Sequence, residues 1–249
     1  MKLADLVGQL RSEERVEMRE VPRIPCTFDN IMQAYLESRN IYEHASNSWQ
    51  RDLQGGYIRE ALGKIDDVEG QYWQLFYDQI TAKKMRGREE LFFDRFIDEL
   101  CRHVSDKSVI HLKKDTYNFG TGISTGKTIT ITGNVVNLCT RMQSGTIHFN
   151  GNVQDAGRSM LGGNLKVQSK NTLMSCGSGL DGGRIDVVGK VIHVGHDAKQ
   201  GTINCYGQVS GMIGANAESS VAIHVFGRPH PEIHNTCRAR VYYREMRIK

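Results

Sequence analysis

The sequence lacks any long hydrophobic run. No stretch of about 18 apolar residues occurs in its 249 residues, which excludes a membrane-spanning helix. The first residues, MKLADLVGQLRSEERVE, become acidic before an apolar stretch can form, so we expect no signal peptide. The six cysteines are scattered without a Cys-x-x-Cys motif, which argues against a disulfide framework or a zinc site. We therefore expect a cytoplasmic protein with reduced thiols and no cofactor.

Proline is scarce, with 4 residues against 26 glycines, and the glycines are unevenly placed. Only six glycines precede residue 111, whereas 12 of the 19 aromatic residues do. Residues 1–110 carry 16 Lys/Arg and 20 Asp/Glu, and residues 111–249 carry 16 and 8. Such a sharp change of composition predicts two domains, residues 1–107 and residues 108–249.

The first domain is predicted to be α-helical. Apolar residues recur at three- and four-residue steps over residues 28–41, 58–80 and 88–104, which is typical of amphipathic helices. The aromatic side chains of these segments, together with Trp49, could form a helical core or contact a partner protein. We favour the core.

An internal repeat organises the second domain. The segments TITITG, TIHFNG, NLKVQS, RIDVVG, TINCYG, AIHVFG and RVYYRE align, and their second residues are spaced by 18, 18, 20, 18, 20 and 18. In each segment two apolar residues flank an outward one, as in a strand with one buried face. A glycine closes most copies, which suits a sharp corner. These corner glycines are Gly133, Gly151, Gly189, Gly207 and Gly227.

This pattern predicts a β-solenoid of about seven coils of 18–20 residues, filled by a ladder of aliphatic side chains. The hexapeptide helix of acyltransferases also has 18-residue coils, but it needs an aliphatic residue at every sixth position. Stepping from Ile129 meets Arg141 and Ser159, so this alternative fails.

The segments SGTIHFNGNVQDAGRSMLGGNLKV (144–167) and DGGRIDVVGKVIHVG (181–195) resemble the GXGXG β-helix family. The family pattern of glycine, methionine and a glycine pair before a strand is met by Gly157, Met160, Gly162 and Gly163. This family includes the C-terminal domain of the glutamate synthase large subunit and one of the subunits of formylmethanofuran dehydrogenase. The resemblance covers residues 125–227 and implies an α+β protein whose second domain is a right-handed parallel β-helix. It also implies a spacer that holds other parts in place and carries no chemistry of its own.

A weaker resemblance is to bactofilins and to the C-terminal domain of the septum inhibitor MinC. Those domains are also short, glycine-cornered solenoids, and they self-assemble end to end or through a face. The resemblance therefore implies a filament as an alternative role.

The outward residues of the repeat form a predicted column along one wall. Lys166 and Asp186 should face each other on adjacent coils, with Asn204 and His224 beyond them. A carboxylate near a histidine can do acid–base chemistry, so Asp186, His224, His148 and Lys166 are candidate catalytic residues. The alternative, which we favour, is an ordinary solvated wall. The full column is Thr130, His148, Lys166, Asp186, Asn204, His224 and Tyr242.

Two other motifs suggest ligands. His193, His196 and Asp197 lie together near a corner and are candidate metal ligands, with exposed corner histidines as the simpler interpretation. The segment GTGISTGKT (120–128) resembles a phosphate-binding loop, but the glycine spacing is wrong and a strand follows it. We interpret it as the loop that leads into the first repeat.

Two clusters of basic residues could bind nucleic acid. The alternative at the C-terminus is that charge protects the open edge of the last coil from further stacking, and we favour it. The basic residues are Lys83, Lys84, Arg86, Arg238, Arg240, Arg244 and Arg247.

Together these patterns predict a non-enzymatic scaffold or assembly subunit. Its rigid solenoid and aromatic-rich helices would dock other protein subunits or a second copy of the chain, and we expect no membrane partner. The alternatives are a bactofilin-like filament protein, and an enzyme or ligand-binding protein that uses the outward column.

Overall fold

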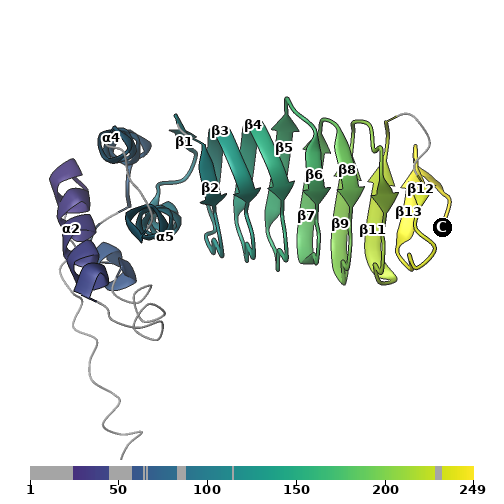
Figure 1. Ribbon diagram of the computed structural model, residues 1–249, viewed down its shortest axis with the longest axis horizontal. Coiled ribbons are helices and arrows are strands. Elements are labelled where there is room, and N and C mark those ends of the chain that lie inside the picture. The colour runs from purple at the N-terminus through teal and green to yellow at the C-terminus, as the bar shows by residue number, and fades with distance from the viewer. Residues whose placement is uncertain are drawn as a thin grey trace, which may run out of the picture.

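The computed structural model describes residues 25–44, 58–63, 65, 67–82, 88–113, 115–227 and 232–249. It confirms a helical N-terminal region followed by a parallel β-solenoid of about seven turns. The helices lie at one end of an elongated rod, and the C-terminus lies at the other (Figure 1). None of the helices in these segments is both long enough and apolar enough to cross a membrane.

The N-terminal region contains α2 (Phe28–His44), a short helical segment over residues 58–63, α4 (Gly70–Thr81) and α5 (Arg88–His103). The prediction of one helix over residues 58–80 is wrong. Between the two helical pieces Val68 pairs with Val104 in a parallel bridge. The Val68 amide donates to the carbonyl oxygen of His103 at 2.7 Å, and this long-range bond takes the place of a helical one.

Aromatic rings fill the core of the helical region. Tyr35 of α2 contacts Phe76 of α4 and Phe92 and Phe96 of α5, with centroid distances of 5.3, 5.4 and 5.1 Å. All four side chains are buried, as is Trp73 of α4. These rings therefore stabilise the bundle and are not available to a partner protein, while Trp49 lies outside the described residues.

Each coil of the solenoid contributes to two walls. The first wall is built by β1 (Ser108–His111), the first halves of β3 (Thr128–Leu138) and β4 (Thr146–Ala156), β5 (Asn164–Ser169), β7 (Asp181–Val188), β9 (Gln200–Cys205), β11 (Ser220–Val225) and β13 (Arg240–Tyr243). The second wall is built by β2 (Thr116–Phe119), the second halves of β3 and β4, β6 (Leu173–Cys176), β8 (Val191–Val194), β10 (Met212–Ile213) and β12 (Glu232–Ile233).

The predicted inward ladder forms the core of the rod. Parallel pairing aligns Ile129, Ile147 and Leu165 on successive coils, and the same register continues to Val241. Of the fourteen residues predicted to point inward, only Tyr243 is not buried. Tyr243 belongs to β13, the last strand of the repeat, on which no further coil stacks.

The third side of each coil is a turn that the repeat alignment did not include. The first residue of this turn adopts the left-handed backbone conformation, as Gly157 does with φ 68° and Gly177 with φ 67°. Three residues after this position an apolar side chain enters the core, and it closes the third side of the ladder. These buried residues are Ile123, Met142, Met160, Leu180, Ala198 and Ala217.

The corner glycines are required mainly by close packing between coils. Only Gly133 and Gly189 have a positive φ, of 134° and 146°. At Gly151 a Cβ atom would lie 1.9 Å from the carbonyl oxygen of Gly133, and at Gly207 it would lie 1.7 Å from that of Gly189. The prediction that every corner needs the conformational freedom of glycine is therefore incomplete, because the other corners need its lack of a side chain.

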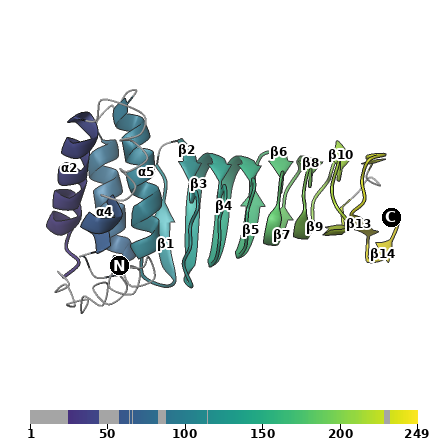
Figure 2. The same cartoon turned by 90° about the horizontal axis from the view of Figure 1, so that it is seen from below.

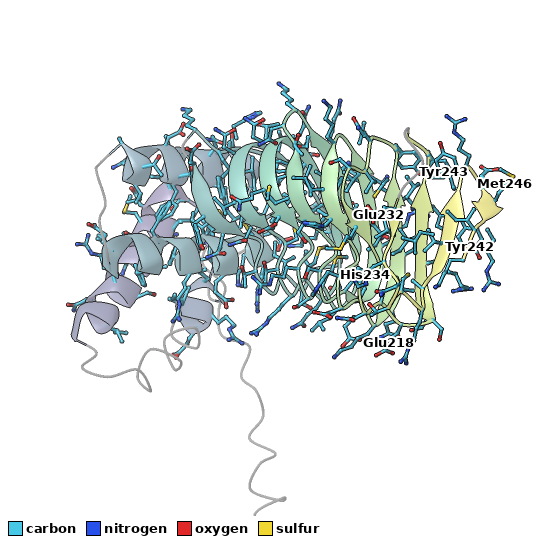
Figure 3. The ribbon with its side chains drawn as sticks, turned by 45° about the vertical axis from the view of Figure 1, so that its right-hand side comes forward. Glu218, Glu232, His234, Tyr242, Tyr243 and Met246 are labelled. Atoms are coloured by element: carbon cyan, nitrogen blue, oxygen red, sulfur yellow. The ribbon has the colours of Figure 1, made fainter. Side chains whose placement is uncertain are left out.

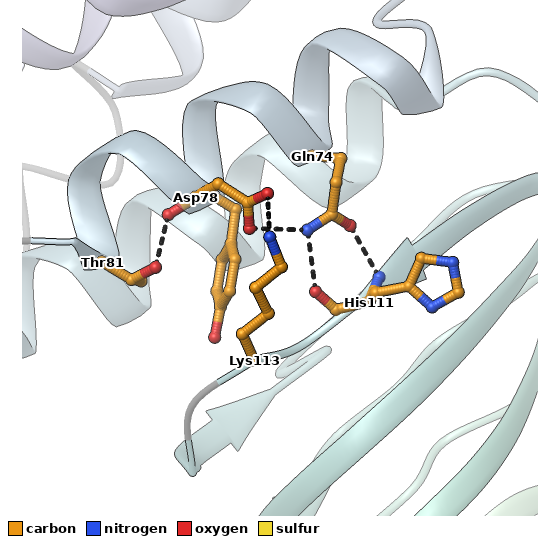
Figure 4. A network of polar contacts seen from close by, with 6 residues as sticks. Gln74, Asp78, Thr81, His111 and Lys113 are labelled. Carbon is orange, nitrogen blue, oxygen red and sulfur yellow. Dashed lines mark hydrogen bonds and ion pairs between the residues drawn. The ribbon is translucent and has the colours of Figure 1, made fainter.

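The helices cover the first coil of the solenoid (Figure 2), with α4 against β1 and α5 against β2. The Gln74 side chain pairs with the outer edge of β1: its Nε2 donates to the His111 carbonyl at 2.9 Å, and its Oε1 accepts from the His111 amide at 2.8 Å (Figure 4). Lys113 forms an ion pair with Asp78 of α4 at 2.5 Å. This strand edge is therefore closed to another chain.

The first-wall strand of the last coil, β13, is covered by a hairpin. Arg244 and Glu245, both with positive φ, form a two-residue turn that brings β14 (Met246–Arg247) antiparallel to β13. The Ile248 amide donates to the carbonyl oxygen of Val241 at 2.9 Å and extends this cover. Tyr242, Tyr243 and Met246 lie together at this end of the rod (Figure 3).

We expect the Gly207→Ala variant to be less stable than the native chain by about 1–3 kcal/mol, because the new methyl group must displace the backbone of the coil beneath it. Urea unfolding measures this difference. Gly126→Ala is the control, since a Cβ atom there meets nothing within 4 Å. Equal losses in the two variants would contradict the close packing of the coils.

Candidate functional site

The outward column on the first wall is the best-defined candidate site. Strand register places Thr130 beside His148, His148 beside Lys166, and Lys166 beside Asp186. Asn204, His224 and Tyr242 follow on the next coils. The structure therefore brings the predicted column together in the predicted order.

Lys166 and Asp186 lie beside each other as predicted, but Asp186 forms its ion pair with Arg184. Arg184, two residues earlier on β7, donates from Nε to both carboxylate oxygens of Asp186 at 3.0 Å. The Asn204 side chain adds a third hydrogen bond at 2.5 Å. The hydrogen bonds that Arg184 itself donates to Asp186 are the main reason that the pKa of Arg184 is raised. The carboxylate is thus already neutralised from its own strand.

Lys166 consequently keeps an uncompensated charge. Within the described residues no carboxylate lies within ion-pair distance of its ammonium group. Its neighbour His148 has a lowered pKa, first because of burial and second because of the charge of Lys166. His148 is therefore neutral at neutral pH and can donate or accept a hydrogen bond.

Four rings continue the wall towards the C-terminus. Tyr206 stacks on Phe226 with centroids 4.9 Å apart, and His224 stacks on Tyr242 at 4.5 Å, each pair inclined by only 8°. Burial is the main cause of the lowered pKa of His224. His224 lies two coils, about 10 Å, from Asp186. The two residues therefore do not form the acid–base pair suggested by the sequence.

A hollow of about 380 Å³ lies on this wall between the charged column and the rings. It spans five coils, or about 19 Å along the axis. Its floor includes Val188, which is 51% exposed, and one end is bounded by Tyr206. The other polar side chains around it are those of Thr130, His148, Asn150, Lys166, Gln168 and Asp186.

The candidate metal ligands are not gathered into a site. His196 Nδ1 contacts the carboxylate of Asp197 at 2.8 Å, and both are exposed on the turn side. His193 lies on β8 of the second wall, in register with Ser175. The described part of the chain holds no cluster of three or more His, Cys, Asp or Glu side chains that could bind a metal ion.

The remaining predicted sites are placed as follows. The segment 120–128 runs directly into β3 and so lacks the helix N-terminus that a phosphate-binding loop needs. Arg238, Arg240, Arg244 and Arg247 are exposed around the final hairpin, where β14 itself covers the strand edge. Lys83, Lys84 and Arg86 lie outside the described residues.

The buried cysteines are not activated nucleophiles. Burial raises the pKa of Cys205 to about 12 and that of Cys176 well above its ordinary value. Both thiols point into the core of the rod, so at neutral pH they remain protonated.

The second wall carries an apolar strip that the sequence analysis missed. Met174 of β6 is 46% exposed and lies beside the half-buried Ile192 of β8. Met212 of β10, on the next coil, is 39% exposed and lies one residue away from this column, beside His193. We call the three apolar residues the methionine strip. The alignment did not reveal it, because it covered only the first strand of each coil.

No protein-family model, curated protein or solved structure matches the chain. The resemblance to the GXGXG family therefore stays a prediction.

We expect the Lys166→Met variant to have a higher His148 pKa than the native protein, because one of the two causes of its depression is removed. The pKa should stay below its ordinary value, since burial is the larger cause. An NMR titration of the imidazole protons measures it, with Lys190→Met as a control outside the hollow. An unchanged pKa in Lys166→Met would show that the two side chains do not interact.

Proposed function

We propose that the protein is a non-enzymatic scaffold that docks another protein on the second wall of its solenoid. The observation that carries the proposal is the methionine strip. Solvent-facing positions of a strand are normally polar, whereas here apolar side chains face outward on three successive coils, with Met174 and Met212 exposed and Ile192 half-buried. Contiguous exposed apolar surface is typical of interaction sites, and methionine adapts to varied partner surfaces.

The covered edges of β1 and β13 support docking through a wall rather than through these strand edges. Gln74 occupies the outer edge of β1, and β14 covers the edge of β13. A filament of stacked rods would need at least these edges free. The bactofilin-like alternative would therefore have to assemble through a face.

The rigidity of the solenoid suits a scaffold. Backbone hydrogen bonds link every coil to the next, and the apolar core runs without interruption from the helices to the last coil. A partner bound to the second wall would thus be held at a fixed distance from the helical end.

We expect Met174→Glu to abolish binding of the partner, because the new charge would be buried on docking. The test is gentle affinity purification of the tagged chain from its own cells, with stoichiometries measured by mass spectrometry. The native chain should recover another protein in a fixed ratio. Leu161→Glu is the matched control, since Leu161 is 49% exposed on the turn side and should leave recovery unchanged.

Two results would contradict the scaffold. One is a mass in analytical ultracentrifugation that grows with protein concentration, which would favour self-assembly. The other is turnover of a substrate by the isolated chain that Asp186→Ala abolishes, which would favour an enzyme.

A further inference from the structure

The hollow on the first wall has the features of a ligand site, and it is separate from the methionine strip. Its volume of about 380 Å³ lies within the range of small-molecule sites. Its length of about five coils suits a short chain of linked units better than a single compact molecule.

The charges around the hollow favour a ligand with one negative group. Asp186 is neutralised by Arg184, which holds both of its oxygens. Lys166 has no such partner among the described residues and projects from the wall at the middle of the hollow. An anion bound there would meet an ammonium group and, beside it, the imidazole of His148.

One end of the hollow is a platform for a ring. One face of Tyr206 is covered by Phe226 at 4.9 Å, and Phe226 lies on the side away from the hollow. The other face of Tyr206 is on the side of the preceding coil, where Val188 is its neighbour in the register. A ring placed on this face would continue the ladder of parallel rings and would lie about one coil from Lys166.

The neutral polar groups favour a hydroxylated ligand. Asn150 and Gln168 lie beside each other on successive coils, about 4.8 Å apart, and Thr130 lies one coil before His148 in the neighbouring column. Amide side chains both donate and accept hydrogen bonds, as hydroxyl groups require. A nucleic acid would instead need a row of cations to match its phosphates, and Lys166 is the one lysine that lines this hollow.

We propose that the hollow binds a carboxylated saccharide chain, with one sugar ring stacked on Tyr206 and one carboxylate paired with Lys166. The amides of Asn150 and Gln168 hydrogen-bond the sugar hydroxyls. The inference does not depend on the scaffold role, because it uses the other wall.

The test is isothermal titration of the full chain with tetramers of glucuronic, mannuronic and galacturonic acid. Each acidic tetramer is compared with its uncharged counterpart, the tetramer of glucose, mannose or galactose. At least one acidic tetramer should bind about tenfold more tightly than its uncharged counterpart, as expected for one charge-assisted hydrogen bond. The bound carboxylate should also raise the pKa of His148, which NMR measures on the same sample.

Variants assign the contacts. Lys166→Met should remove the preference for the acidic tetramer, while Lys190→Met keeps it. Tyr206→Ala should weaken the acidic and uncharged tetramers alike, by about tenfold, whereas Tyr117→Ala, at an exposed tyrosine outside the hollow, should not. Met174→Glu should leave saccharide binding unchanged, so failure of the scaffold role and failure of this site are distinguishable.

Three outcomes would overturn the proposal. The first is that no acidic tetramer binds at concentrations up to about 10 mM. The second is that binding is unaffected by both Lys166→Met and Tyr206→Ala in chains that keep the native circular dichroism spectrum. The third is that a short single-stranded DNA binds more tightly than every saccharide and loses affinity steeply with salt.

Discussion

The hydrogen-bonded register between successive coils is the constraint on which the rest of the structure depends. Each coil must return to the same point one strand spacing further along the axis, so every position of one coil lies beside its equivalent in the next. Inward positions then have to be apolar, and corners have to allow backbone contact. Gly151 and Gly207 meet the second demand, because a carbonyl oxygen of the preceding corner occupies the space of a side chain.

This constraint explains which features the sequence could predict. The repeat from Ile129 to Val241 determined the core ladder and the order of the outward column, since register follows directly from equal spacing. The repeat could not reveal β1 and β2. Their coil lacks a closing glycine, and its residue Ser108 pairs with Ile129, a spacing of 21 residues instead of 18 or 20. The sequence also could not identify the ion-pair partner of Asp186, because the choice between Lys166 and Arg184 depends on side-chain geometry and not on register. The break at Val68 depends on a contact with Val104 that helical periodicity does not report.

The same register gives the two walls different characters. On the first wall it aligns a neutralised carboxylate, an ammonium group and a stacked tyrosine along one hollow. On the second wall it places the exposed Met174 and Met212 two coils apart in neighbouring columns. The helices cover the first coil and the hairpin covers the edge of β13, so the two walls are the surfaces on which we propose binding. A docked protein and a bound saccharide could therefore occupy the same rod at once.

Distances between spin labels along one column of the first wall would test the register most directly. Thr128, Thr202, Ala222 and Arg240 belong to a single column of equivalent positions. A label at residue 128 paired in turn with labels at residues 202, 222 and 240 should give distances near ~19, ~24 and ~29 Å, a rise of about 5 Å per coil. Distances that did not rise by a constant step would contradict the solenoid register and, with it, both proposed binding surfaces.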